Sequence, residues 1–392
     1  MDGKIAVIGL GTVGSMILWR SSLRTEGVVG FEQFNPASEN TAVGGDTRMF
    51  RMAYREGAEF SQLLTESEKL WKELSEISGE TVLDQSNGAL TISTDHGEYF
   101  EEFTHSAAQT GMSYESLDHE RLRDTFPQHH LLPTDIGFFD PRGGLLRTDL
   151  AVLSAIEQAK INGAQVRTSA QIEQIIPHET YVEIVVDGQR MAFEKVVIAA
   201  GAWSRNLIPE HYSQWLKAGR ILLTWYPAKH PQEFSADAFP AFMRDSSELH
   251  MWGAPTIDGN TVKLGGIVPP QEIPEISEMD RSLSASEINR CNEAVKRFLP
   301  GLYPTCVRSK AYPDLYSMDN NPLIGWLEEM PGVYLATGFS GKGFKMASGV
   351  GEAIAQELST GQQNPAIAFA DPDRFRDRTP TNHDWERLSQ VQ

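Results

Sequence analysis

The sequence predicts an α/β fold in which a discontinuous Rossmann-like domain is combined with an α+β domain built on an antiparallel sheet. Three observations predict it. A β-α-β unit with a glycine-rich turn opens the chain at residues 4–32, and buried-strand runs at 196–200 and 332–337 also lead into glycine-bearing turns. Between those runs, residues 207–270 contain repeated short β-like segments. The chain therefore returns to one sheet from three distant positions.

The first unit carries the most specific pattern. Lys4–Gly9 is an uninterrupted apolar strand, and the string GLGTVG places glycines at 9, 11 and 14 before a helix-compatible stretch, Ser15–Leu23. A second strand, Val28–Phe31, ends at an acidic residue. This order suits a dinucleotide, because the glycines allow a tight turn, close approach of the pyrophosphate and helix packing, while the acid binds a ribose diol. The predicted contacts are Gly9, Gly11, Thr12, Val13, Gly14, Glu32 and Gln33. The alternative is an ordinary glycine turn.

The motif alone does not separate NAD from FAD. An extended FAD molecule is expected to touch a second segment near the C-terminus, and residues 338–345 (GFSGKGFK) join a buried strand to the helix-like stretch Met346–Leu358. Such a junction offers backbone N–H groups to an electron-rich ring. The strand at 196–200 also ends in Gly-Ala-Trp, at the edge where such sheets bind ligands. The contacts predicted from these segments are Gly201, Trp203, Gly341, Lys342, Gly343 and Phe344.

Composition restricts the function further. The chain has 392 residues, and 53 acidic minus 34 basic residues give a net charge of −19, which argues against nucleic-acid and membrane binding. Only Cys291 and Cys306 are present, without zinc-ligand spacing, so a disulfide scaffold is excluded and no metal site is expected. No targeting or membrane segment is recognisable, and we expect a cytoplasmic protein, a monomer or small homo-oligomer.

Four strings together resemble the monomeric sarcosine oxidase and N-methyltryptophan oxidase family of FAD-dependent amine oxidases, within the D-amino-acid-oxidase-like superfamily. They are GLGTVG at 9–14, GGDTRMFRMAYREG at 44–57, KLG at 263–265 and GFSGKGFKMASGVGE at 338–352. The resemblance covers nearly the whole chain in consistent order. It implies FAD as cofactor, an amine substrate that carries a carboxylate, and O2 reduced to hydrogen peroxide.

The resemblance also implies roles for individual residues. Arg48 matches a catalytic arginine beside the flavin ring, where a fixed cation stabilises the charge of the reduced ring. Arg51 and Lys345 match the pair that holds the substrate carboxylate. Lys263 matches a catalytic lysine that promotes oxygen reduction, although on periodicity alone it is an outward residue of a strand. Further residues expected near the cofactor are Gly45, Asp46 and Thr47.

Two departures from the family pattern matter. Sarcosine oxidases attach FAD to a cysteine, whose place is taken here by Tyr312 or, with a short gap, Asp314, and the family's histidine before GDTR is Gly44. We therefore expect noncovalent FAD. In the substrate region a family histidine is replaced by Ile267 and a family tyrosine by Trp252, and Trp252 is expected to line the substrate site. Both changes make the pocket more apolar, so the substrate need not be sarcosine.

The remaining segments complete the predicted organisation. We assign residues 1–82, 146–206 and 305–375 to the FAD-binding domain, 83–145 and 207–304 to the substrate domain, and 376–392 to a C-terminal tail. Residues 60–78 and 285–298 have helical spacing, 81–94 are expected to form strands around an Asn-Gly turn, and 269–284 a loop. The pair His129-His130 is expected at the surface.

Three functions remain open. The first is an oxidase of a small carboxylate-bearing amine, either an N-alkyl or a sugar-modified amino acid. The second is a flavin dehydrogenase that passes electrons to a quinone or a carrier, in which Lys263 would not be needed. The third is a non-catalytic nucleotide-binding protein, against which the presence of both Arg51 and Lys345 argues.

Overall fold

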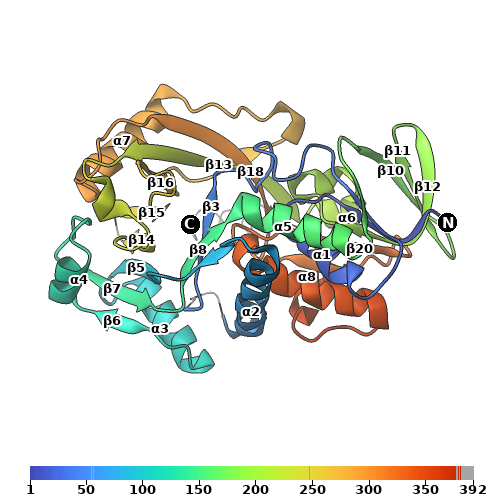
Figure 1. Ribbon diagram of the computed structural model, residues 1–392, viewed down its shortest axis with the longest axis horizontal. Coiled ribbons are helices and arrows are strands. Elements are labelled where there is room, and N and C mark those ends of the chain that lie inside the picture. The colour runs from blue at the N-terminus through green and yellow to red at the C-terminus, as the bar shows by residue number, and fades with distance from the viewer. Residues whose placement is uncertain (54, 56, 247, 377, 379, 381–392) are drawn as a thin grey trace.

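The computed structural model describes residues 1–53, 55, 57–246, 248–376, 378 and 380. Two large sheets lie at opposite ends of the long axis, and helices and a small third sheet lie between them (Figure 1). The predicted α/β class is confirmed. The C-terminal residues predicted as a tail lie mostly outside the described part of the chain.

The first sheet has a parallel centre of the order β9-β2-β1-β12-β20. Alternate residues of β1 are buried on opposite faces, since Ile5 and Val7 pack with the helices while Ala6 and Ile8 pack with a second cluster. Burial on both faces explains why these strands read as continuous apolar runs. The strands are β1 (Gly3–Ile8), β2 (Val28–Phe31), β9 (Gln165–Arg167), β10 (Ile172–Pro177), β11 (Val182–Val186), β12 (Gln189–Ile198), β19 (Leu323–Trp326) and β20 (Val333–Thr337).

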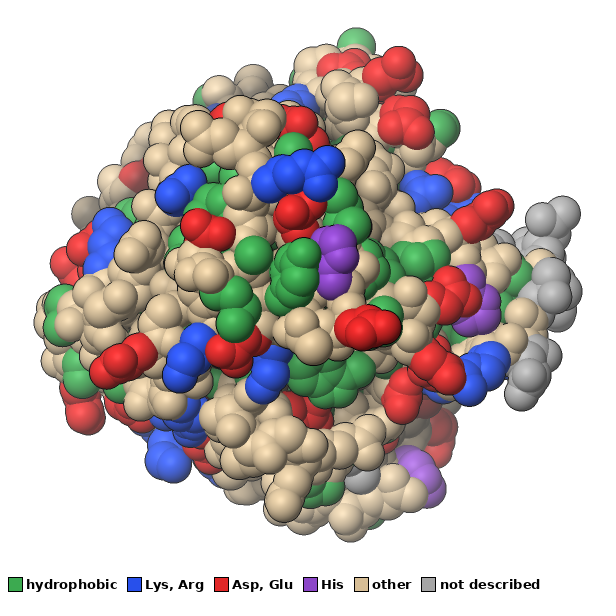
Figure 2. All heavy atoms as spheres, turned by 90° about the vertical axis from the view of Figure 1, so that its right-hand side faces the viewer, with side chains coloured by type: hydrophobic (Ala, Val, Ile, Leu, Met, Phe, Trp, Pro, Cys, Tyr) green, Lys and Arg blue, Asp and Glu red, His purple; other side chains and the backbone are tan. Residues whose placement is uncertain are grey.

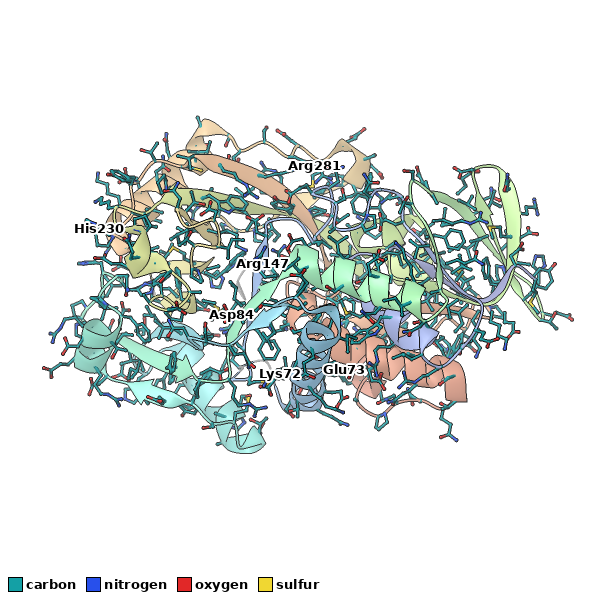
Figure 3. All side chains as sticks on the ribbon, viewed as in Figure 1. Lys72, Glu73, Asp84, Arg147, His230 and Arg281 are labelled. Carbon is teal, nitrogen blue, oxygen red and sulfur yellow. The ribbon has the colours of Figure 1, made fainter. Side chains whose placement is uncertain are left out.

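Helices α1, α5 and α8 cover one face of this sheet, and α2 packs on α8 (Figure 1). Arg20 ties three of them together, because its guanidinium on α1 pairs with Glu73 of α2 at 2.8 Å and with Glu352 of α8 at 2.6 Å. Figure 3 shows Glu73 on the side of α2 that is next to α8. The helices are α1 (Thr12–Ser22), α2 (Ser61–Ser78), α3 (Glu98–Thr110), α4 (His119–Thr125), α5 (Thr148–Ile161), α6 (Glu210–Ser213), α7 (Ala285–Phe298) and α8 (Gly343–Thr360).

The second sheet is antiparallel except for the parallel pair β5/β14. Its long strand β13 pairs with β18 on one edge and with β16 and β17 on the other, and α7 packs over its apolar face. The strand β18 falls in a segment assigned above to the FAD-binding domain. The strands are β5 (Ala89–Thr94), β6 (Glu115–Leu117), β7 (Asp135–Asp140), β13 (Leu216–Pro227), β14 (Ala241–Ser246), β15 (Leu249–Ala254), β16 (Thr261–Gly265), β17 (Gln271–Ile273) and β18 (Arg308–Ser317).

A three-stranded antiparallel sheet lies between the two large ones. It consists of β3 (Thr47–Phe50), β8 (Gly144–Arg147) and β4 (Leu83–Asp84), in the order β3-β8-β4. Strand β3 also contacts α8 on one side and β14 and β15 on the other. This small sheet therefore places the GDTR string between the two predicted domains.

Three local predictions need correction. The strands around Asn87-Gly88 do not form a hairpin, because β4 pairs with β8 while β5 pairs with β7 and β14. The segment 269–284 is not only loop, since it contains β17 and a short 3₁₀ helix, Ile276–Glu278. Of the two adjacent histidines only His130 is exposed; His129 is buried between the rings of Phe239 and Phe242.

The surface carries interspersed charges. On the face shown in Figure 2, acidic and basic side chains alternate, and no large area is formed by basic side chains alone. Within the described chain, no helix combines the length and the apolar character needed to cross a bilayer.

Candidate functional site

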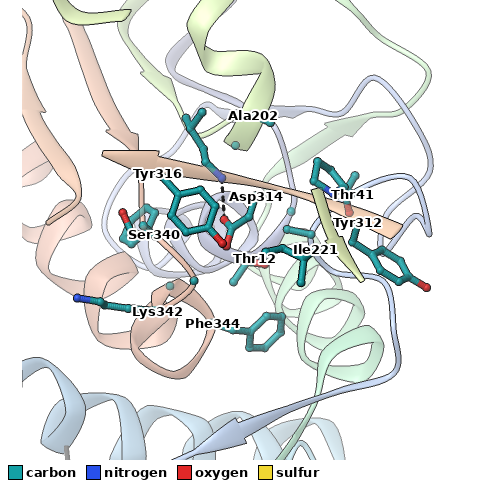
Figure 4. A pocket seen from close by; sticks show the side chains of 18 of the residues that line it. Thr12, Thr41, Ala202, Ile221, Tyr312, Asp314, Tyr316, Ser340, Lys342 and Phe344 are labelled. Carbon is teal, nitrogen blue, oxygen red and sulfur yellow. Dashed lines mark hydrogen bonds between the residues drawn. The ribbon is translucent and has the colours of Figure 1, made fainter. Parts of the chain in front are cut away.

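A cavity of about 700 Å³ lies where the carboxyl ends of the first sheet, the small sheet and the second sheet meet. Its lining comes from segments far apart in sequence, including residues 8–13, 31–33, 199–203 and 336–345 (Figure 4). The carboxyl edge of an open parallel sheet is the usual ligand site of such folds. Most of the residues predicted from the sequence converge here.

The glycine-rich turn between β1 and α1 forms one end of the cavity. Gly9 has a φ of +85°, and a Cβ on Gly14 would lie 1.8 Å from the carbonyl oxygen of Gly9. These two glycines therefore permit the turn and the close packing of α1 on the strand. Gly11 differs, since a Cβ there would meet only the Val43 side chain, at 3.8 Å. Its missing side chain keeps space for a ligand. The neighbours Thr12 and Val13 line the same wall.

Glu32 follows β2 and lines the cavity with Gln33. Its carboxylate accepts hydrogen bonds from the backbone N–H groups of Leu10 and Phe34, each at 2.9 Å. Burial raises the pKa of this carboxyl, and the backbone donors oppose that rise. The side chain is thus fixed at the end of the second strand, where a ribose diol is bound in dinucleotide sites.

The junction of β20 and α8 forms the opposite wall. Gly341, Lys342, Gly343, Phe344 and Lys345 all line the cavity. The α8 start is held in place because Trp71 of α2 donates a hydrogen bond from Nε1 to the Lys345 carbonyl at 3.0 Å, and Phe344 stacks on the same indole.

Gly201 and Trp203 line the cavity from the turn that follows β12. The Gly201 carbonyl accepts a hydrogen bond from the Thr337 hydroxyl at 3.2 Å, which joins this turn to β20. The Trp203 ring packs edge-on against Phe34. These contacts fix the third wall.

Arg48 lies on β3 and faces the cavity. Its guanidinium donates to three backbone carbonyls, those of Thr47 and Ala42 at 2.7 Å and that of Gly44 at 2.9 Å. Burial lowers the pKa of Arg48, and the nearby Tyr312 and Asp314 oppose that change. The cation is therefore held by neutral dipoles and keeps its charge available to a ligand.

Arg51 and Lys345 line the same cavity, and both are buried. The Arg51 guanidinium donates to the hydroxyl of Tyr99 at 3.1 Å. The carboxylate of Asp245, also on the lining, lies near enough that Arg51 and Arg55 help to lower its pKa, together with His250 and against the effect of burial. Arg51 and Lys345 thus contribute two cations to the lining of one cavity, the kind of charge that a carboxylate-binding site requires.

Lys263 lies behind the wall rather than on it. Its Nζ donates to the Gly45 carbonyl at 2.8 Å, to the Thr47 hydroxyl at 2.5 Å and to the Thr47 carbonyl. Burial and the charge of Arg48 lower its pKa well below the usual value. Five predicted residues do not contribute to the lining: Gly14, Gly45, Asp46, Thr47 and Lys263.

Trp252 on β15 lines the cavity beside Ile267. A Cβ on Gly265 or Gly266 would collide with its indole, at 2.4 and 2.9 Å. The paired glycines therefore create the space that the ring occupies. Met243 and Leu223 extend this apolar side.

Asp314 is the main lining residue whose role the sequence did not reveal (Figure 4). Its Oδ1 accepts a hydrogen bond from the Leu315 N–H at 2.8 Å, and no cation pairs with it within the described chain. Burial raises its pKa to about 6, although the backbone N–H groups of Leu315 and Gly341 and the charge of Arg48 oppose the rise. The sequence singled Asp314 out only as the gapped match to the family's attachment cysteine, and nothing there indicated a buried carboxylate in the cavity wall.

Tyr312, which takes the place of the family's attachment cysteine, also lines the cavity, and its hydroxyl donates to Glu39. Cys291 and Cys306 are free thiols, and neither lines the cavity. Among the described residues, no three metal-binding side chains come together.

The residues present fit FAD. The space left open at Gly11 and the fixed Glu32 suit the pyrophosphate and ribose, and the 341–344 turn with Arg48 suits an electron-rich ring.

Comparison with known proteins agrees with this geometry. Residues 4–357 match the family described as FAD dependent oxidoreductase. The chain is 28% identical to the N-methyl-L-tryptophan oxidase of Yersinia pestis (strain Pestoides F) over 357 residues, covering 91% of this chain and 94% of that protein. Two solved structures share the fold: the L-proline dehydrogenase of P. horikoshii (TM-score 0.80, 20% identity, 97% of this chain and 99% of that one) and fructosyl amine:oxygen oxidoreductase (Amadoriase I) of Aspergillus fumigatus (TM-score 0.77, 16% identity, 96% and 91%).

Substitutions can separate two roles of the glycine turn, the packing of α1 at Gly14 and the space for FAD at Gly11. Gly14→Ala is expected to destabilise the protein by more than about 3 kcal/mol, because the new Cβ overlaps the Gly9 carbonyl. Gly11→Ala is expected to change the stability of the FAD-free protein by less than about 0.5 kcal/mol but to weaken FAD binding at least about tenfold. Urea unfolding and FAD titration measure the two effects. Unchanged FAD affinity in Gly11→Ala would contradict the assignment of this turn.

Asp314→Asn is expected to stabilise the FAD-free protein above pH 6. An acid whose pKa rises from 3.8 to about 6 on folding destabilises the folded state once it ionises, so the cost is absent below about pH 4 and complete above about pH 6–7. The variant should gain about 1–3 kcal/mol at pH 7.5 and nothing near pH 3.5. Thermal unfolding across this range measures it, with the exposed Asp187→Asn as control; a gain independent of pH would argue against a buried carboxylate.

Proposed function

The chain belongs to the FAD dependent oxidoreductase family, and on that premise we propose that it is an oxidase of a small amine that carries a carboxylate. The enzyme class is FAD-dependent amine or amino-acid oxidation. The observation that carries the finer proposal is that Arg48, Arg51 and Lys345 all line one cavity. FAD held by these residues would supply two-electron oxidation: a hydride equivalent lost from the carbon next to the amine nitrogen and a proton lost from that nitrogen would leave an imine, and the same two electrons with two protons would reduce O2 to hydrogen peroxide.

The chain's own residues bind and orient the substrate. The fork of Arg51 and the ammonium of Lys345 hold the carboxylate, which leaves the rest of the amine against Trp252, Ile267 and Met243. These apolar side chains exclude water, so the cations act at low dielectric and gain strength.

Arg48 supplies fixed positive charge where the cofactor ring gains negative charge. Three backbone carbonyls hold its guanidinium before any reaction, so no reorganisation is needed. Lys263 supplies a second cation, which favours the negative charge that develops on O2 and therefore favours an oxidase over a dehydrogenase.

The substrate class follows from the same features. An N-methyl-L-tryptophan oxidase is one curated relative, and a fructosyl amine oxidoreductase shares the fold. Both names describe amines carrying a large substituent, which agrees with a cavity whose lining includes Asp245 and His250 as well as apolar side chains. We propose N-alkyl or sugar-modified amino acids as substrates, and FAD bound without a covalent link.

The test is an anaerobic screen of N-methyl, cyclic and fructosyl amino acids. At least one is expected to bleach the flavin absorbance, and admission of air should restore it with one hydrogen peroxide per flavin. If every compound leaves the flavin oxidised, the proposal fails. Bleaching that only a quinone or other electron acceptor reverses at a useful rate identifies the dehydrogenase instead.

Arg51→Ala is expected to weaken substrate binding by about 2–5 kcal/mol, because the carboxylate loses its bidentate partner. The measurement is the dissociation constant of a bleaching substrate or a carboxylate inhibitor. Decarboxylated analogues provide the control and should bind both proteins equally. Equal loss of affinity for both kinds of ligand would place the carboxylate site elsewhere.

A further inference from the structure

Three side chains form a row across the second sheet: Lys263 on β16, Trp225 on β13 and Arg308 on β18. The pairing register places Trp225 opposite Lys263 on one edge and opposite Arg308 on the other. Directly opposite residues project from the same face of a sheet and lie close together. The guanidinium of Arg308 stacks over the Trp225 indole, 3.9 Å from its centre.

The whole row contacts the turn at residues 45–47. Lys263 donates to carbonyls on either side of Asp46, those of Gly45 and Thr47. The other two side chains of the row donate to the Asp46 carboxylate. Its Oδ1 accepts from Arg308 Nη2 at 2.9 Å, and its Oδ2 accepts from Trp225 Nε1 at 3.1 Å. The residue between the two ammonium-binding carbonyls is thus anchored by the ion pair.

This turn needs external support. Asp46 has a φ of +69°, in the left-handed region that is unfavourable for a residue with a side chain. Gly45 before it has a φ of +90°. Since the backbone conformation is unfavourable, the contacts of the Asp46 carboxylate help to fix where the Gly45 and Thr47 carbonyls point, together with Arg48, which also donates to the Thr47 carbonyl.

The two ends of the row differ in exposure. Lys263 is 4% exposed, whereas the Arg308 side chain is 48% exposed. Arg308 and Asp46 do not line the cavity. The charged groups that act on Lys263 are Arg48 and Arg308, which with burial lower its pKa, and Asp46, which raises it. An ion pair at the surface is therefore linked through one turn to a buried ammonium.

We propose that Arg308 and Asp46 are positioning residues for Lys263, holding the 45–47 turn so that its carbonyls fix the ammonium beside the cofactor cavity. The inference rests on the proposed oxidase function, in which Lys263 promotes the reaction with O2. Oxygen reactivity then depends on an ion pair that touches neither substrate nor cofactor.

The test measures how fast the reduced holoenzyme reacts with O2 as a function of pH. Light-driven reduction with a sacrificial donor prepares the reduced enzyme without any amine, and rates are taken per bound flavin.

Arg308→Met is expected to slow the reaction three- to tenfold and to raise the pH at which the rate falls, because Asp46 is left unpaired near the ammonium. Asp46→Asn should move that pH in the opposite direction, because it removes the anion. Lys263→Met should abolish this fall in the rate with rising pH.

Arg308→Lys restores a cation opposite Asp46 and is expected to recover most of the rate. The matched control is Arg374→Met, which also removes an arginine that pairs with an aspartate, at 2.9 Å from Asp319, and stacks on a ring, 4.3 Å from the centre of Phe375. Its rate and pH profile should equal those of the wild type.

Unchanged profiles in both Arg308→Met and Asp46→Asn, or shifts in the same direction, would overturn the proposal, since loosened structure alone gives no opposite shifts. The result is independent of the amine screen. If no amine bleaches the flavin but the opposite shifts appear, the proposed substrate class fails and the positioning role stands.

Discussion

The structure depends on holding positive charge in a buried place without neutralising it. The protein as a whole has a net charge of −19, yet Arg51, Lys263 and Lys345 are buried around one cavity and Arg48 faces it. Burial of an unpaired cation is costly unless hydrogen bonds compensate it. Backbone carbonyls supply that compensation here: three accept from Arg48, and two, with a hydroxyl, accept from Lys263. Dipoles stabilise the cations and leave their charge free to act on a ligand.

The architecture follows from this requirement. The carbonyls belong to residues 42–47, a segment that must lie against both the parallel sheet and the second sheet. The short strand β3 achieves this, since it pairs with β8 and contacts α8, β14 and β15. Asp314 contributes the opposite charge. Above about pH 6 its carboxylate is ionised and offsets part of the positive charge of the cations in the same cavity.

The cofactor end of the site was predictable from the sequence because glycine at a tight turn leaves a short local pattern. Gly9 and Gly14 occupy places where a side chain would collide with backbone, so their spacing alone locates the turn. Continuous apolar runs likewise identified β1, β12 and β20, since both faces of a parallel sheet are buried.

The other features depend on long-range pairing, which no local pattern encodes. Trp225 faces Lys263 and Arg308 only because β13 pairs with β16 and β18 in one register, and the cavity-lining Asp314 is placed by the same pairing of β18 with β13. Lys263 was predicted as a catalytic lysine from the family resemblance, but no pattern indicated that its ammonium is held by the 45–47 turn, an arrangement set by residues more than 200 positions away. The Asn-Gly turn suggested a hairpin, yet sheet topology sends its two strands to different sheets. His129 is buried because the Phe239 and Phe242 rings enclose it, a packing that polarity alone does not foresee.

The most direct measurement is the midpoint potential of the bound flavin at pH 7.5, compared with free FAD in the same buffer. Arg48 and Lys263 are held mainly by backbone carbonyls, and positive charge near the cavity stabilises the more negative, reduced form, so the bound flavin is expected to have the higher potential even with Asp314 ionised. A potential equal to or below that of free FAD would contradict the claim that the protein maintains net positive charge at this site.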